Sequence, residues 1–329
     1  MDTALEQLRV LAIQADDAGR HKVLDGIRNL QLQLETPRDT PGRFSGLYLE
    51  VTAARIGVNL GIFKILVTKD QPLELSTFSA EIGAASEVLS RILRYLTSVG
   101  MIRETAKDTF AANSITKTLS QAGYEGGIVH FFDNIGPCFQ AFPDFLVETK
   151  YQDVTNSFNT AFQRAFDTSE TAFKWLPKYP ERFGPLQQVM TVQGAAGVPW
   201  FEVFPFEKEL AGFIGSCIFV DVGGGFGHQC HILVNRFQDL KEIIVNIPSN
   251  LIGAFGPDSQ ILIHEMVLPD VGVSWEAATI DLSIMCSLGA RERTIGQWYA
   301  LLDAAGLQAL RIDTYNRRRQ DSVIQAVLK

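Results

Sequence analysis

Residues 217–227 read CIFVDVGGGFG, and this stretch decides the fold of the last third of the chain. A short apolar run bounded by turn residues is typical of a buried strand. It ends near an acid, Asp221, and leads into the glycines Gly223, Gly225 and Gly227. Glycine lets main-chain N–H groups come close to a ligand, and the N-terminus of a following helix adds positive potential. The stretch therefore predicts a strand, a ligand-binding loop and a helix.

The segments after this loop alternate between strands and helices. Apolar runs of strand length are separated by stretches with helical periodicity, and Gly306 stops the last helix. Such alternation is typical of a doubly wound α/β domain. We expect strands at residues 261–266, 309–315 and 322–328, and helices at residues 228–237, 280–288 and 295–305.

The beginning of the chain is predicted to be helical. Residues 1–36 have apolar side chains at helical spacing and end before two prolines. Such an arm usually packs on another helix or on a second subunit. Residues 44–67 predict a strongly apolar helix pair, broken near Gly57 and Gly61.

Residues 73–119 follow the order of a winged helix. Helices are predicted at 76–82 and 86–99, the second stopped by Gly100, and two short strands follow within 101–113. A winged helix either binds DNA or serves as a dimerisation module, and the acidic balance of the chain favours dimerisation. The apolar residues of the second helix that should face inward are Val88, Leu89, Ile92, Leu93, Tyr95 and Leu96.

Residues 126–200 are helical in pattern and rich in aromatic side chains. Most of these side chains are expected in the core, because aromatic residues dominate core packing. The same density, with Met190 and His130, also suits a pocket for a flat or polyketide-like small molecule, and both interpretations stay open. The aromatic residues concerned are Phe131, Phe132, Phe139, Phe142, Phe145, Phe158, Phe162, Phe166, Phe173 and Trp175.

Composition limits the classes of function. The 329 residues are enough for two domains, and the formal net charge of −8 disfavours nucleic acid and anionic membranes as partners. The N-terminus lacks an apolar run of signal-peptide length, so the cytoplasm is the expected location. The four cysteines form no CxxC pair, which predicts reduced thiols and no metal site.

Seven stretches together resemble the fungal and plant type of S-adenosylmethionine-dependent small-molecule O-methyltransferases. The resemblance covers nearly the whole chain and implies an α+β and α/β architecture. Residues 1–205 would form a helical, winged-helix dimerisation and substrate domain, and residues 206–329 a Rossmann-like cofactor domain. The stretches are LSRILRYLTSVGMIRET (89–105), AGYEGGIVHFFDN (122–134), WFEVFPFE (200–207), FVDVGGGFGHQ (219–229), GPDSQILIHEMVLPD (256–270), RERTIGQWYALLDAAGL (291–307) and DSVIQAVLK (321–329).

The resemblance also assigns site residues. Asp221, Gly223, Gly225 and Gly227 match the S-adenosylmethionine loop of the family. Glu265 and Glu292 match two acids that flank the catalytic histidine of the family, the general base that accepts the proton of the substrate hydroxyl. That histidine should lie in an HDW-like motif, and this sequence has none.

The cofactor domain is short. Only residues 228–260 lie between the glycine loop and the next matching strand, whereas each βαβ unit takes about 30 residues, so roughly 60 residues are missing. Residues 239–255 can be interpreted as a helix or as a second strand, with Asn246 where the family has its ribose-binding acid. Either interpretation weakens or removes cofactor binding and leaves strand 217–222 as an apolar edge.

His130 is the remaining candidate acid or base. Some fungal members of the family have been recruited to dehydration and pericyclic ring closure, with a histidine in that region. The structural alternative is a histidine whose ring is satisfied by a helix carbonyl. Four hypotheses follow: a catalyst of dehydration or cyclisation without methyl transfer, a working O-methyltransferase, a non-catalytic dimer partner, and a shortening that arises from an error in gene prediction or splicing. A homodimer is expected.

Overall fold

The computed structural model describes residues 2–192, 200–206, 208, 217–221, 232–233, 236, 240–245 and 259–329. The chain forms two compact units. The first comprises residues 1–153 and 157–195, and the second comprises residues 154–156 and 196–329. The division therefore falls earlier than the predicted 205/206 boundary, and the aromatic residues from Trp200 onward belong to the second unit.

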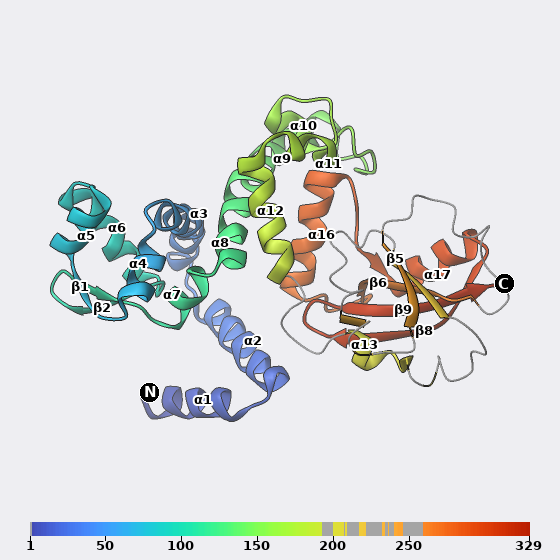
Figure 1. The fold of residues 1–329 in the computed structure, drawn as a ribbon, viewed down its shortest axis with the longest axis horizontal. Coiled ribbons are helices and arrows are strands. Elements are labelled where there is room, and N and C mark those ends of the chain that lie inside the picture. Colours follow the sequence, from blue (N-terminus) through green and yellow to red (C-terminus); the bar gives the residue numbers. More distant parts are fainter. Residues whose placement is uncertain are drawn as a thin grey trace. The chain divides into compact units, whose positions relative to one another are not determined.

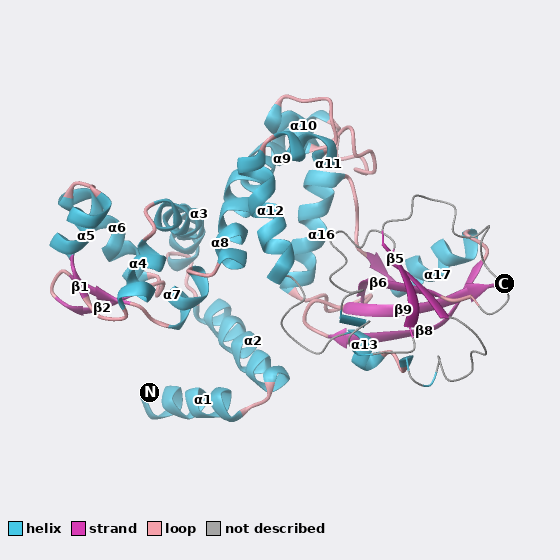
Figure 2. Cartoon of the chain, in the orientation of Figure 1, coloured by secondary structure: helices cyan, strands magenta, loops and turns pink. Residues whose placement is uncertain are grey.

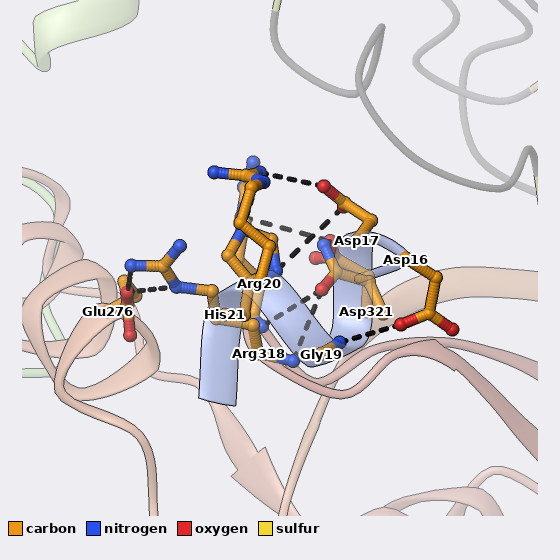
Figure 3. A network of polar contacts seen from close by, with 10 residues as sticks. Asp16, Asp17, Gly19, Arg20, His21, Glu276, Arg318 and Asp321 are labelled. Carbon is orange, nitrogen blue, oxygen red and sulfur yellow. Dashed lines mark hydrogen bonds and ion pairs between the residues drawn. The ribbon is translucent and has the colours of Figure 1, made fainter. Parts of the chain in front are cut away.

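The first unit is mainly helical (Figure 1). The expected arm is present as α1 and α2. The Asp16 carboxylate caps the start of α2 by accepting a hydrogen bond from the main-chain N–H of Gly19 at 2.8 Å (Figure 3).

By length and composition, no single described helix could cross a membrane, but α3 and α4 together, with a bend of 60° between them, are long and apolar enough to do so. The helices are α1 (Asp2–Gln14), α2 (Asp17–Leu34), α3 (Asp39–Asn59), α4 (Ile62–Lys69), α5 (Leu75–Ile82), α6 (Ser86–Ser98), α7 (Ser114–Leu119), α8 (Ala122–Val129), η1 (His130–Ile135), α9 (Gly136–Glu148), α10 (Ala161–Phe166), α11 (Ala172–Trp175), η2 (Leu176–Lys178) and α12 (Pro180–Val192).

The break between α3 and α4 lies at Gly61 alone. Gly61 adopts a left-handed conformation with φ +66°, which a glycine reaches without steric cost. The second predicted break was wrong, because Gly57 continues α3. A side chain at Gly57 would stand 2.8 Å from the ring of Phe63, so this glycine serves close packing and not chain reversal.

The segment with the winged-helix pattern contains the expected helices and hairpin. The strands β1 (Leu73–Glu74), β2 (Arg103–Ala106) and β3 (Thr109–Ala111) form a sheet in the order β1-β3-β2. Gly100 ends α6 with φ +77°, as predicted. The prediction for Val88 was wrong, because it lies at the margin of the apolar stripe and is 58% exposed. The fully buried residues of α6 are Leu89, Leu93 and Leu96.

Helices α8 and α12 lie side by side in the first unit (Figure 1). Their close approach depends on glycine. A β-carbon built on Gly126 would stand 2.9 Å from the main-chain oxygen of Pro185, and one on Gly123 would stand 2.3 Å from the side chain of Val192. This packing sets the start of α12 against the turn that follows α8.

The second unit contains strands and helices in alternation (Figure 2). Its larger sheet has the order β7-β6-β9-β8, and β4 pairs in parallel with β5. Strand β9 is central: Val323 and Ile324, adjacent in sequence, belong to different core clusters on its two faces. The elements are α13 (Trp200–Val203), β4 (Cys217–Asp221), β5 (Leu240–Val245), β6 (Ile261–Leu268), α16 (Trp275–Leu288), β7 (Arg293–Thr294), α17 (Ile295–Ala304), β8 (Leu307–Asn316) and β9 (Asp321–Leu328).

The strands predicted in this unit are confirmed, and one ambiguity is resolved. Residues 240–245 form a strand, so the second-strand interpretation holds and the helical one was wrong there. Helix α16 begins at Trp275, earlier than predicted. Within the described residues, no pairing joins β4 and β5 to the four-stranded sheet. The predicted helix at 228–237 lies outside the described residues, apart from isolated positions.

Candidate functional site

The histidine singled out by the sequence lies in a turn of unusual geometry. His130 is the first residue of η1, a π-helical turn between α8 and α9. Such turns occur mostly as single insertions in α-helices, frequently at functional sites. Only 8% of the His130 surface is exposed, and burial lowers its pKa from 6.5 to about 4. The ring is therefore a neutral imidazole at neutral pH.

The side chain of Asn134 holds this ring. Its Nδ2 lies 2.9 Å from Nδ1 of His130, one helical turn earlier, and 3.0 Å from the main-chain oxygen of Arg182. The guanidinium of Arg182 donates to Oδ1 of Asn134 at 3.3 Å and to the main-chain oxygen of Asp133 at 2.6 Å. The alternative of a helix carbonyl satisfying His130 is thus not what the structure shows, because an amide side chain contacts it.

Further contacts of two arginines restrain the turn η1, which carries His130. Arg55 of α3 forms an ion pair with the Asp133 carboxylate, with Nη2 to Oδ2 at 2.9 Å and Nε to Oδ2 at 3.1 Å. Arg182 lies over the rings of Phe166 and Trp175, at 5.0 and 5.7 Å from their centroids. Two-point contacts of a guanidinium with a carboxylate restrict orientation as well as distance. The turn that carries His130 is therefore held from α3, α12 and the aromatic cluster.

The aromatic region is only partly core. Phe145 and Phe162 are buried, and Phe162, Phe166, Trp175 and Tyr179 form a chain of ring contacts with centroids 4.3–5.5 Å apart. Other side chains of this region are exposed, and for these aromatic residues the expectation of a core position was wrong. Helical periodicity does not distinguish a core face from a face that meets a ligand or partner. The exposed side chains are Phe131, Phe139, Phe158 and Phe173, together with Met190.

The second unit brings Glu265 and Glu292 together. Strand β6 pairs with β7 at Val267 and Arg293, which places Glu292 beside the strand that carries Glu265. Burial, followed by the charges of Glu265, Asp281 and Asp321, raises the pKa of Glu292 to about 7. Burial also raises the pKa of Glu265. Glu292 therefore carries a proton for part of the time at neutral pH and can donate one.

His264 does not join these two acids. Neighbouring side chains on a strand point to opposite faces. The ring of His264 stacks on Trp200, with centroids 5.9 Å apart, and its Nε2 contacts the Tyr315 hydroxyl. The pair of glutamates therefore has no histidine from β6 between its members.

Three consecutive arginines, Arg317, Arg318 and Arg319, lie in the turn between β8 and β9, and two of them form ion pairs. The Arg318 side chain contacts the Glu276 carboxylate of α16, as Figure 3 shows. Arg319 lies 3.8 Å from Asp321, whose charge acts on Glu292. The turn thus belongs to the charged surroundings of the two glutamates.

The cofactor residues are described only in part. Asp221 ends β4 opposite Val245 of β5, whereas Gly223, Gly225 and Gly227 lie outside the described residues. Since residues 240–245 form the second strand, Asn246 follows it where the resemblance requires an acid. An amide binds ribose hydroxyls more weakly than a carboxylate does. At these positions the sequence therefore matches the cofactor loop of the family at Asp221 and the three glycines and departs from the family at Asn246.

Metal binding finds no support in the described part of the chain. There, no group of three or more His, Cys, Asp or Glu side chains could hold a metal ion. Cys138 and Cys286 are buried thiols, as predicted. Burial raises the pKa of the Cys286 thiol to about 12, so this thiol stays protonated and inert.

Sequence patterns missed the residues that hold His130. Asn134 follows it at i+4 on a helical segment, a spacing that places side chains on one face, and this signal was present. Arg55 and Arg182 are remote in sequence from the turn, and no local pattern marks them.

Comparison with known proteins places these features in a family. The model of the O-methyltransferase dimerisation domain matches residues 44–121. The chain is 32% identical to demethylsterigmatocystin 6-O-methyltransferase of Aspergillus flavus, over 100% of this chain and 98% of that protein. The solved structure of LepI in complex with SAM matches with a TM-score of 0.92 and 30% identity, over 100% and 98% of the two chains. A structure described as a pericyclic reaction enzyme matches with the same TM-score and identity, over 100% and 99%.

The alignment with the Aspergillus enzyme also measures the shortening. It covers the whole chain and is 382 positions long, which exceeds the 329 residues by 53. At least that many positions of the relative have no counterpart in this chain. This agrees with the shortfall of roughly 60 residues expected from the size of βαβ units.

Proposed function

Because this chain belongs to the family of S-adenosylmethionine-dependent small-molecule O-methyltransferases, as its motifs predict, we propose that it catalyses dehydration or cyclisation without standard methyl transfer. The substrate is an aromatic or polyketide-like small molecule of secondary metabolism. The observation that carries the proposal is the ordered setting of His130, in a chain that lacks an HDW-like motif.

A dehydration requires one group that donates a proton and another that accepts one. In a dehydration, the C–O bond of an alcohol breaks, the hydroxyl leaves as water with a proton from an acid, and a base removes a proton from the neighbouring atom. Glu292, with its pKa near 7, is able to serve as such an acid, and Glu265 as its partner. His130, in the first unit, is a separate candidate, because its neutral ring can by itself polarise a substrate oxygen. The similarity to the pericyclic reaction enzyme supports this class of reaction.

The test uses purified protein and β-hydroxy carbonyl compounds on aromatic or polyketide-like scaffolds. We expect conversion with loss of water, followed by mass spectrometry, at equal rates with and without added S-adenosylmethionine. His130→Gln should slow the conversion, whereas Val271→Ser, at an 88% exposed position of the second unit, should not. A methylated product, or inertness toward the whole panel, would contradict the proposal.

An O-methyltransferase is the second candidate. The identity to demethylsterigmatocystin 6-O-methyltransferase and the likeness to LepI in complex with SAM favour it. Isothermal titration with S-adenosylmethionine separates the two candidates. We expect no micromolar binding, because Asn246 replaces the ribose-binding acid and the chain is shortened. Micromolar affinity together with methyl transfer would favour the second candidate.

We further propose a homodimer. The match to the dimerisation domain begins at Phe44, where α3 exposes a row of large apolar side chains. Neither α1 nor α2 contains a buried residue, although both have apolar side chains at helical spacing. Burial of such a surface in a second copy is the usual solution, since large exposed apolar patches mark interaction sites. A full-length relative in place of the second copy would correspond to the non-catalytic partner. The exposed large apolar residues of α3 are Phe44, Leu47, Tyr48, Leu49 and Val51.

A further inference from the structure

The amide of Asn134 can adopt only one orientation. Its Oδ1 faces the Nη1 of Arg182, a donor, at 3.3 Å, and its Nδ2 faces the main-chain oxygen of Arg182, an acceptor, at 3.0 Å. Rotating the amide by 180° would place donor against donor and acceptor against acceptor. Arg182 has no acceptor on its guanidinium, and a carbonyl has no donor. The two contacts with Arg182 therefore settle which atom of Asn134 is nitrogen.

This orientation decides the role of the imidazole. The second hydrogen of Nδ2 points to Nδ1 of His130, 2.9 Å away, so Nδ1 has to accept a hydrogen bond. A neutral imidazole carries one proton, and an accepting Nδ1 places that proton on Nε2. We propose that Arg182 and Asn134 act as positioning residues that fix His130 as the Nε2–H tautomer, a hydrogen-bond donor to a substrate oxygen and not a general base.

Burial supports the same assignment. A protonated ring would put an N–H on Nδ1, opposite the amide N–H of Asn134, and the buried setting already disfavours the charge, which is why the pKa of His130 lies near 4. Arg182 is itself held by the main-chain oxygen of Asp133 and by two aromatic rings. A continuous set of hydrogen bonds thus forms a relay from Arg182 through Asn134 to His130.

Among the described residues, Nε2 of His130 has no hydrogen-bond partner. Within the described part of the chain, Nδ1 is the ring nitrogen of His130 that has a hydrogen-bond partner. Nε2–H can therefore donate to a carbonyl, an enolate or a departing hydroxyl oxygen. A neutral donor stabilises negative charge that develops on such an oxygen and needs no prior proton transfer. This inference rests on the proposed dehydration or cyclisation, because it names the kind of substrate atom that His130 contacts.

The direct test is the protonation pattern of the ring. Full-length protein labelled with ¹⁵N-histidine contains five histidines, and the His130→Gln variant identifies the signals of His130 by their loss. At neutral pH, long-range ¹H–¹⁵N spectra should show a protonated Nε2 and an unprotonated Nδ1. A protonated Nδ1, in a neutral ring or in an imidazolium, would overturn the proposal. This measurement on the unaltered protein requires no substrate.

Variants of the relay extend the test. Asn134→Asp replaces the donor with an acceptor, so the ring proton should move to Nδ1. Arg182→Met removes the donor that orients the amide, and the signals of His130 should shift toward a mixture of tautomers. Arg164→Met is the matched control, because Arg164 pairs with exposed Glu148 and Asp144 and leaves Asn134 untouched. Unchanged tautomers in both relay variants, with the fold retained, would contradict the relay.

The rate of substrate conversion by variants at position 130 distinguishes a hydrogen-bond donor from a general base. Glutamine at position 130 keeps an N–H near the place of Nε2, whereas glutamate offers only acceptors. His130→Gln should retain activity within about tenfold, and His130→Glu should lose at least about a hundredfold, the effect of removing one preorganised donor. The opposite order would identify a base. If the unaltered protein converts no substrate, the proposed function fails while the spectra still decide the tautomer.

Discussion

A β-carbon built on Gly126 of α8 would stand 2.5 Å from the Cβ of Gln188 in α12. The two helices can approach this closely only because position 126 has no side chain. The approach also brings Arg182, near the start of α12, to the turn that carries Asn134 and His130. The glycine of one helix thus controls the setting of a histidine at its end.

Gly126→Ala should therefore destabilise the protein by about 1–3 kcal/mol, the usual cost of overpacking. The clash includes the main-chain oxygen of Pro185 at 2.9 Å, which cannot rotate away. The control is Gly184→Ala in α12, where nothing lies within 4 Å of the new β-carbon. That variant should be neutral or more stable by up to about 1 kcal/mol, because alanine favours helices. Urea denaturation measures both, and equal stabilities would refute the packing argument.

His130 should make stability depend on pH. Its pKa is about 4 in the folded protein, below the ordinary 6.5, so the unfolded chain binds more protons between these values. The contribution is fully present above about pH 6.5 and is lost as the pH falls toward 4, by about 3 kcal/mol in total. Denaturation of the protein and of His130→Gln from about pH 7 to 4 should show the variant gaining relative stability. A difference that does not change with pH would contradict this expectation.

Glu292 should act with the opposite sign. Its folded pKa of about 7 exceeds the ordinary 4.5, so the folded protein binds the extra proton. The contribution is fully present below pH 4.5 and is lost as the pH rises through 7. Glu292→Gln should therefore be more stable than the unaltered protein at about pH 8, by about 1–3 kcal/mol, and nearly equal at about pH 4. Val271→Ser, at an 88% exposed position of the same unit, should show no such trend in urea titrations.

The apolar face of α3 should control assembly. Leu47→Asp places a charge at a 52% exposed apolar position and should convert a dimer into a 36.4 kDa monomer, measured by light scattering. Val271→Asp, at an 88% exposed position of the second unit, should leave the mass unchanged. A mass that does not respond to Leu47→Asp, or an unaltered protein that is already a monomer, would show that α3 does not form the interface.

Much of the fold follows from local pattern. The strand before the glycine loop, the helix ended by Gly100 and the strands at 309–315 and 322–328 were predictable, because period and terminating residues are properties of short segments. The wrong predictions also relied on local pattern alone. A glycine inside α3 cannot be told from a glycine that breaks a helix, and an exposed Phe173 cannot be told from a buried Phe162, until their neighbours are known.

The amino-acid sequence by itself determined the order of elements, the family and the shortening of the cofactor domain, since these depend on spacing along the chain. Only the tertiary structure decided that Arg182 contacts Asn134 and that burial, followed by the charge of Glu265, raises the pKa of Glu292. The physical reason is that hydrogen bonds and charges act through space, over a few ångströms, between segments whose separation along the chain has no bearing on their distance.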